Sequence, residues 1–152
     1  MPQSQRVLRE HPFTQGLDET QISALARIAT TVTFEEDELI LVDGERSRSF
    51  YLLSSGSVVV ELRGAQYVIA VQALGPGAVF GWSALLDDHD TLFQVRAREN
   101  TTALQLDGAA LRAQCMSDTA LGAEFYHRIL GVVAGRVKAT EMRFAEMCGI
   151  KV

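Results

Sequence analysis

Apolar and polar positions divide the chain into three segments with different periodicity. In the first segment, apolar residues recur near helical spacing from Leu17 to Ala29, which predicts one short helix. Asp18 stands at the start of this run and Gln21 follows three residues later, a pattern typical of a capping box at a helix N-terminus. We expect the helix to end near residues 30–31, where β-branched residues begin, and the first dozen residues to be frayed.

The second segment, from about Val32 to Asp107, contains short apolar runs separated by turn residues. Several short strands at this spacing are typical of a β-sandwich or barrel. No helical pattern long enough for a crossover lies between the runs, which disfavours a doubly wound parallel sheet. The predicted strands cover residues 39–42, 50–53, 58–62, 67–74, 94–98 and 102–106.

The third segment has helical periodicity again. A short run over residues 109–116 is followed by a break at residues 117–119, where Asp118 can cap a longer run that continues to about Met147. We expect part of the long helix to pack on its own barrel and part on a second copy of the chain; the alternative is a helix lying wholly on its own barrel. The stripe that predicts this packing consists of Leu121, Phe125, Ile129, Val132 or Val133, Arg136, Val137 and Phe144.

Composition places the chain among ordinary globular domains. It has 152 residues, 47% of them hydrophobic and 22% charged, which predicts one domain over residues 1–152, with the first helix and barrel over about 17–107 and the C-terminal helices over about 108–147. A net charge of −5 argues against nucleic acid and anionic lipid as partners. The first residues contain no apolar core of signal-peptide length, and no apolar run approaches the ~18 residues that span a bilayer, so we expect a cytoplasmic protein with no membrane partner.

One stretch suggests a binding site. Residues 75–86 read Gly-Pro-Gly-Ala-Val-Phe-Gly-Trp-Ser-Ala-Leu-Leu, which indicates a turn, the end of a strand, a glycine and one turn of apolar helix. Such a glycine lets the backbone approach a ligand closely, and a helix start presents free N–H groups, so the stretch suits an anion such as phosphate. A plain tight turn into a short core helix has the same pattern.

The motifs around this stretch resemble the cyclic nucleotide-binding domain. That family is shared by catabolite-activator-type regulators, cyclic-nucleotide-dependent kinases and cyclic-nucleotide-gated channels. The glycines at positions 44, 56, 77 and 81 and the Ala84-Leu85 pair stand where the family pattern has them, and the resemblance covers roughly residues 17–137. It implies a mainly β fold with flanking helices: a double-stranded β-helix, or jelly-roll-like barrel, of about eight strands, with a short N-terminal helix and C-terminal helices that include one long helix.

The resemblance also implies a ligand site, from which this chain departs. The family's phosphate-binding cassette uses a Glu that accepts from the ribose 2′-hydroxyl and an Arg that pairs with the cyclic phosphate. Trp82 replaces the Glu and Thr91 replaces the Arg. Because losing one partner of a buried ion pair costs about 3–5 kcal/mol, we expect weak binding of any cyclic nucleotide. The backbone of Ser83, Ala84 and Leu85 could still hold an anion, while Trp82 favours an aromatic or apolar ligand, or fills the pocket.

The remaining candidates lie outside this stretch. In the family the long helix covers the pocket and often contacts the base. We expect Arg136 and Thr140 to lie at the level of the pocket along this helix. The predicted site therefore consists of Gly81, Trp82, Ser83, Ala84, Leu85 and Thr91, with Arg136 and Thr140 as further contacts. Residues 87–90, Asp-Asp-His-Asp, are metal-ligand types, but their spacing fits no metal site and an exposed acidic loop is favoured.

Two functions from different classes remain. The three histidines lack a Ser or Cys partner at catalytic spacing, so we predict no enzyme, no metal and no firm cofactor beyond a cyclic nucleotide or other small molecule. The first function is a ligand-sensing module that acts through a homodimer or a partner protein and does not bind cAMP or cGMP tightly. The second is a degenerate module that serves only dimerisation or protein interaction. Since five residues follow the long helix, we expect the module to be stand-alone, without a helix-turn-helix domain.

Overall fold

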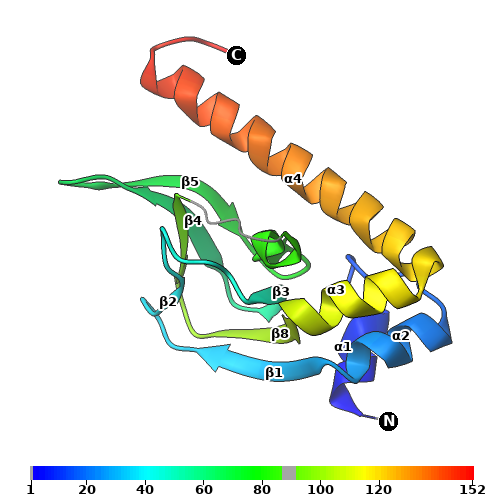
Figure 1. The fold of residues 1–152 in the computed structure, drawn as a ribbon. Helices are drawn as coiled ribbons and strands as arrows, with labels where there is room; N and C mark the ends of the chain where they lie inside the picture. The colour runs from blue at the N-terminus through cyan, green and yellow to red at the C-terminus, as the bar shows by residue number, and fades with distance from the viewer. Residues whose placement is uncertain (1, 87–91) are drawn as a thin grey trace.

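The computed structural model describes residues 2–86 and 92–152, which form eight strands in two four-stranded antiparallel sheets with helices packed on one side (Figure 1). The sheet orders are β1-β8-β3-β6 and β2-β7-β4-β5. The mainly β fold with flanking helices predicted from the sequence is therefore confirmed. The strands are β1 (Ala29–Phe34), β2 (Leu39–Leu41), β3 (Ser49–Ser55), β4 (Val58–Arg63), β5 (Val68–Leu74), β6 (Val79–Phe80), β7 (Phe93–Ala97) and β8 (Thr101–Asp107). The helices are α1 (Gln3–Glu10), α2 (Glu19–Ala26), the 3-10 helix η1 (Trp82–Leu85), α3 (Gly108–Ser117) and α4 (Thr119–Met147).

The N-terminus differs from the sequence prediction in two respects. Residues predicted to be frayed form α1, because Leu8 is fully buried against the rest of the chain. The predicted helix is α2, and it ends at Ala26 because the backbone from Ala29 onward pairs with β8. Its predicted capping box is confirmed: the Asp18 carboxylate accepts from the Gln21 backbone N–H at 2.8 Å, and the Gln21 side chain accepts from the Asp18 N–H at 3.0 Å.

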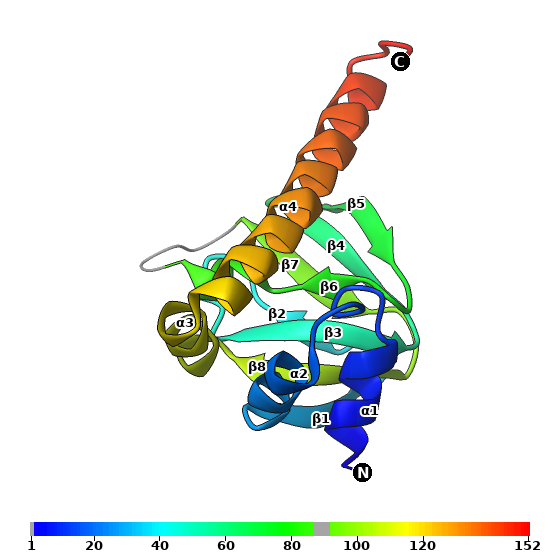
Figure 2. The same ribbon diagram turned by 90° about the vertical axis from the view of Figure 1, so that its right-hand side faces the viewer.

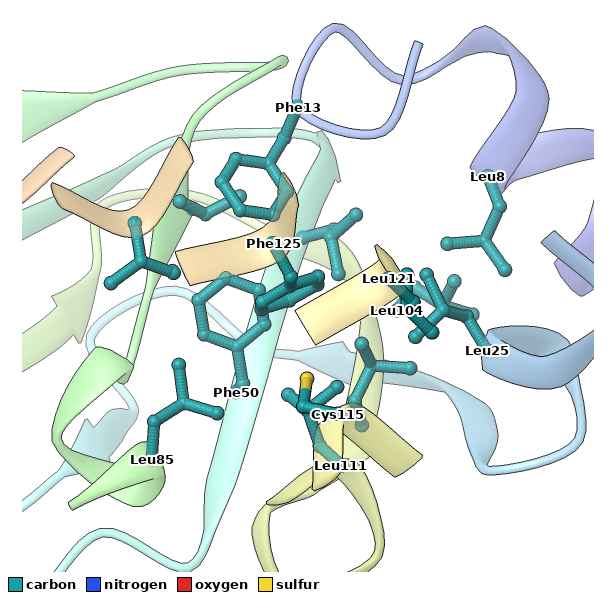
Figure 3. Close-up of a cluster of buried hydrophobic side chains, with 14 of the residues drawn as sticks. Leu8, Phe13, Leu25, Phe50, Leu85, Leu104, Leu111, Cys115, Leu121 and Phe125 are labelled. Atoms are coloured by element: carbon teal, nitrogen blue, oxygen red, sulfur yellow. The ribbon is translucent and has the colours of Figure 1, made fainter. Parts of the chain in front are cut away.

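Strand β3 is covered on both faces and separates two apolar clusters. Alternate residues of a strand point to opposite faces, so Phe50 and Leu52 face the helices while Tyr51 and Leu53 face the second sheet. On the helix side, Phe13, Phe50 and Phe125 meet in tilted and edge-to-face contacts at 5.2–5.5 Å between ring centroids (Figure 3). Each such pair adds about 0.5–1.5 kcal/mol beyond the burial of its area, so this cluster anchors α4 and the N-terminal loop to the sheet.

The long helix α4 is buried at its start and exposed further along. Asp118 caps it as predicted, accepting from the Leu121 N–H at 3.1 Å. Leu121 and Phe125 are fully buried, whereas Val137 and Phe144 on the predicted stripe are 50% and 67% exposed. Both ribbon views show α4 running outward to the C-terminus (Figures 1 and 2), and its last turns face β4 and β5 across a cavity. Within the described residues, no helix combines the length and the apolarity needed to cross a bilayer.

Candidate functional site

Gly81 connects β6 to η1 in a conformation that suits glycine. Its φ is +83° and its ψ is +23°, in the left-handed region. A Cβ at this position would lie 2.5 Å from the Ser49 carbonyl oxygen of β3, so the close approach of the two backbones excludes a side chain as well. The order predicted from the sequence, a strand, a glycine and one helical turn, is present, and the turn is a 3-10 helix of four residues.

The helical turn that follows Gly81 belongs largely to the core. Ala84 and Leu85 are buried, and Leu85 lies in the same apolar cluster as Phe50 (Figure 3). The Ala84 N–H, one of three predicted to hold an anion, donates to the Gly81 carbonyl at 3.1 Å. Ser83 is buried and Trp82 is half-buried, packed against the cluster that contains Phe125. These residues support the fold at least as much as they present a binding surface.

The space in front of the cassette is almost filled. Among the described residues, Trp82, Ser83 and Gly81 from the cassette enclose a cavity of about 20 Å³ together with side chains from β2, β6, β7 and α4. That volume accommodates about one water molecule, whereas sites for small organic ligands measure about 300–1,000 Å³. Inside the barrel, Tyr51 stacks on Phe80 with 4.8 Å between centroids and 13° between planes, and burial raises the pKa of Tyr51. These two rings belong to the apolar cluster between the sheets, and the Phe80 ring borders the small cavity.

Arg136 enters this site from α4. Its side chain is nine-tenths buried and lines the same small cavity as Trp82 and Ser83. Nε donates to the side-chain oxygen of Gln72 on β5 at 2.7 Å, and burial lowers the pKa of the guanidinium. No carboxylate in residues 2–86 or 92–152 forms an ion pair with it. By contrast, Arg128 on the same helix pairs with a glutamate at 2.8 Å.

Comparison with known proteins identifies the family. The sequence model described as the cyclic nucleotide-binding domain matches residues 31–118, more than half of the chain. The chain belongs to the cyclic nucleotide-binding domain family. The match runs from β1 to the cap of α4 and includes the whole cassette.

Individual relatives include a kinase regulatory subunit and a solved protein described as cyclic nucleotide-binding. A cAMP-dependent protein kinase regulatory subunit from Emericella nidulans is 28% identical over 134 residues, 88% of this chain and 28% of that protein. The chain thus spans less than a third of the length of this relative. A solved structure of a protein from Geobacter metallireducens, described as cyclic nucleotide-binding, is 25% identical with a TM-score of 0.78, and the match covers 90% of this chain and 99% of that one.

A third relative is a kinase regulatory subunit of known structure. It is the regulatory subunit of a cAMP-independent protein kinase A from Trypanosoma brucei, solved as a triple variant bound to cAMP in its A site. It is 23% identical, with a TM-score of 0.70 over 93% of this chain and 49% of that one. This likeness shows the cyclic nucleotide-binding domain fold.

The structure brings together four of the eight predicted site residues. Gly81, Trp82, Ser83 and Arg136 line one cavity, whereas Ala84 and Leu85 are turned into the core. The Thr140 hydroxyl donates to the Arg136 carbonyl at 2.9 Å, one turn back on α4, and Thr140 lines none of the cavities described. Thr91 and the acidic loop of residues 87–90 lie outside the described residues.

Sequence reasoning missed the residue that holds Arg136 in place. Gln72 interrupts an otherwise apolar run in β5, and a polar residue in such a run is the signal that would have pointed to it. Of the two cysteines, Cys115 is buried and Cys148 is exposed. Burial, and to a smaller extent the negative charge of Asp118, raises the pKa of the Cys115 thiol to about 11. Within the described part of the chain, no group of three metal-ligand side chains comes together.

Proposed function

We propose that this domain is a non-catalytic ligand-sensing module that does not bind cAMP or cGMP tightly. The observation that carries this proposal is the cassette itself: Trp82 and Thr91 stand where the family has its Glu and Arg, and the cavity beside Trp82 has room for about one water molecule. A cyclic phosphate placed there would have no cassette arginine opposite it. That loss costs about 3–5 kcal/mol, or two to four decades in affinity.

The cAMP-independent kinase subunit supports this interpretation. Its cAMP-bound form carries three substitutions, of a glutamate by alanine, a threonine by arginine and a valine by alanine. One of these substitutions replaces a threonine by arginine, whereas this chain has Thr91 where the family pattern has an arginine. We therefore propose that the threonine at position 91 likewise disfavours cAMP in this chain.

The output of the module is proposed to pass through α4. Its C-terminal half carries exposed apolar side chains, among them Val137 and Phe144, which a second copy of the helix would cover in a homodimer or a partner protein would cover in a complex. The acidic net charge gives no general attraction to nucleic acid. We place the module in the cytoplasm, acting without catalysis and without a membrane partner.

The alternative function is a degenerate module that binds no ligand. The stacking of Tyr51 on Phe80 favours it, because the Phe80 ring lines the small cassette cavity and is covered by Tyr51. In that case α4 would serve dimerisation or protein interaction alone. Ligand binding decides between the two functions, since a degenerate module gains no stability from any small molecule.

The test is a calorimetric titration, first with cAMP and cGMP and then with a panel of nucleotides and aromatic metabolites. We expect neither cyclic nucleotide to bind more tightly than about 100 μM, or about −5.5 kcal/mol. Sub-micromolar binding of either would overturn the proposal. A ligand from the panel present at about 100 times its Kd should stabilise the fold by about 2.7 kcal/mol, and the absence of any such ligand would favour the degenerate module.

A double variant tests the cassette backbone. Trp82→Glu with Thr91→Arg restores both polar residues of the family cassette, and we expect it to bind cAMP measurably by the same calorimetry. Thr91→Arg alone should recover part of this binding, because the charge-assisted contact with the phosphate is the larger contribution. No gain in the double variant would show that the cassette backbone has itself diverged from the family.

A further inference from the structure

A second hollow lies beneath α4, beside the cassette cavity and larger. It measures about 350 Å³, which is within the range of small-molecule sites. We call it the α4 hollow. It lies between one face of α4 and the strands β5 and β6, with the N-terminal loop at one end. The residues used below are Gly131, Gly135 and Arg136 from α4, with Phe13, Gln72 and Val79 opposite them.

Two exposed glycines of α4 border the α4 hollow at its solvent side. Gly131 and Gly135 are four residues apart, so they lie one above the other on the same face of the helix. A Cβ at either position would meet nothing within 4 Å, so close packing does not require a glycine there. Glycine is a poor residue for a helix interior because it loses more backbone entropy than alanine. Because both positions are exposed, a larger side chain at either one would lie across the open side of the hollow.

A buried positive charge borders the same space. Arg136 lines the α4 hollow and is 9% exposed. Its Nε donates to Gln72, but neither terminal nitrogen has a hydrogen-bond partner among residues 2–86 and 92–152. A guanidinium carries five N–H donors and binds planar oxyanions through two of them at once. The two terminal nitrogens of Arg136 are accessible to solvent, so an oxyanion that enters the hollow could replace water on them.

The opposite wall of the hollow is apolar. Phe13 and Val79 belong to the helix-side core and present hydrophobic surface to the space, while Gln72 stands at the Arg136 end. The hollow is therefore charged at one end and apolar along its length. A molecule complementary to it has an oxyanion at one end and an apolar body.

We propose that the α4 hollow binds a small organic anion, with a carboxylate or phosphate group on the terminal nitrogens of Arg136 and an apolar body against Phe13 and Val79. Gln72 holds the guanidinium in position from the other side. This site shares Arg136 with the cassette cavity but lies on its other side, and it goes beyond the proposed function because it needs neither Trp82 nor Thr91. Its ligand would bridge α4 and β5, so its binding would stiffen the junction of the helix with the barrel.

The test uses three probes on the intact chain: benzoate, phenyl phosphate and inorganic phosphate. Saturation-transfer NMR and calorimetry should detect benzoate and phenyl phosphate at millimolar concentration, with inorganic phosphate weaker than phenyl phosphate. A preference for one aryl anion would distinguish a carboxylate ligand from a phosphate ligand. Equal binding of phenyl phosphate and inorganic phosphate would overturn the apolar part of the proposal. No signal from any probe would overturn it entirely.

Three variants locate the binding. Arg136→Met removes the charge at similar volume, and Gly135→Leu places a larger side chain across the open side of the hollow; each should weaken binding by about tenfold or more. Arg143→Met is the matched control, because it removes the same charge from the same helix at a position paired with Glu146 outside the hollow. It should change binding less than about twofold. Equal losses in Arg136→Met and Arg143→Met would show a non-specific charge effect and overturn the site.

The cassette variant separates this proposal from the proposed function. The double variant Trp82→Glu with Thr91→Arg should leave benzoate binding within about twofold of the unsubstituted chain. If cAMP binds the unsubstituted chain tightly while benzoate still depends on Arg136 and Gly135, the proposed function fails and the α4 hollow stands. If benzoate binding depends on Trp82 and Thr91 and not on Gly135, the anion sits in the cassette and the α4 hollow is refuted.

Discussion

Arg136 of α4 and Gln72 of β5 are joined by a single hydrogen bond of 2.7 Å, in which a nearly buried cation donates to a neutral amide oxygen. The two residues are 64 positions apart in the sequence. Their bond lies where α4 leaves the barrel, since Ile129 before it is buried and Val137 after it is half exposed. The direction of the exposed part of the helix therefore depends on a contact that also borders both cavities.

This hydrogen bond predicts that substitutions of Arg136 and Gln72 have non-additive effects on the free energy of unfolding. Gln72→Ala leaves the guanidinium without its described partner, so the free energy of unfolding should fall by about 1–2 kcal/mol. Arg136→Met should be neutral or stabilising, because it replaces a buried charge by an apolar side chain of similar size. In the Arg136→Met background, Gln72→Ala should cost less than about 0.5 kcal/mol. Urea unfolding of the four proteins measures this, and equal costs of Gln72→Ala in both backgrounds would refute the coupling.

A second prediction concerns the glycine at the start of the cassette. Gly81 and Gly44 both have a positive φ, +83° and +78°, so alanine at either position carries the left-handed penalty of about 1–2 kcal/mol. Only at Gly81 would the new Cβ meet a backbone oxygen at 2.5 Å, whereas at Gly44 it would meet nothing within 4 Å. We expect Gly81→Ala to lower the free energy of unfolding by at least about 1 kcal/mol more than Gly44→Ala, measured by denaturant unfolding. Equal losses would mean that the two backbones can separate at little cost.

The features that could be predicted from the sequence are those encoded over a few residues. The caps at Asp18 and Asp118 bond to backbone N–H groups three residues away, and the turn at Gly81 depends on local conformation, so each leaves a local pattern. Six predicted strands lie within two residues of those observed for the same reason.

The features that could not be predicted depend on contacts between distant residues. Helix α1 is ordered because Leu8 is buried and because the His11 ring bonds to the Leu53 carbonyl, 42 residues away, at 3.0 Å. The stacked pair of rings between the sheets depends on Tyr51 meeting Phe80. In both cases a sequence pattern shows that a side chain is apolar or polar without showing which residue it meets.

The contact of His11 predicts a pH-dependent stability. The Nδ1 atom of His11 accepts from the Phe13 N–H at 3.1 Å, and its Nε2 donates to the Leu53 carbonyl. The buried ring is therefore neutral, because a proton on Nδ1 would point at the Phe13 N–H. Burial lowers the pKa of His11 below the ordinary value of 6.5. Below about pH 6.5 the unfolded chain therefore binds a proton before the folded one does, so this contribution is complete above that pH and is lost as the pH falls.

The measurement is urea unfolding between pH 5 and pH 8, and the readout is the slope of the unfolding free energy with pH. His11→Gln should reduce this slope below pH 6.5 by up to about 1.4 kcal/mol per pH unit, whatever its effect on absolute stability. His127→Gln, at an exposed position on α4, is the control and should leave the slope unchanged. A slope in His11→Gln equal to that of the unsubstituted chain would assign the pH dependence to other groups.

The last prediction concerns the exposed face of α4. Leu130, Val137 and Phe144 are seven residues apart and 66%, 50% and 67% exposed, a spacing at which apolar side chains form the seam of a helix pair. If this face joins two copies, sedimentation equilibrium should give twice the chain mass of 16.6 kDa, and Val137→Glu should return the protein to a monomer because it places a charge in the seam. Met116→Glu introduces the same charge at a side chain that is 80% exposed on α3, outside the face, and should leave the dimer intact. If the unsubstituted chain is a monomer at tens of micromolar, the homodimer is rejected and this face is left to a different partner protein. If both variants lose the dimer, the seam lies elsewhere or the dimer is sensitive to any added negative charge.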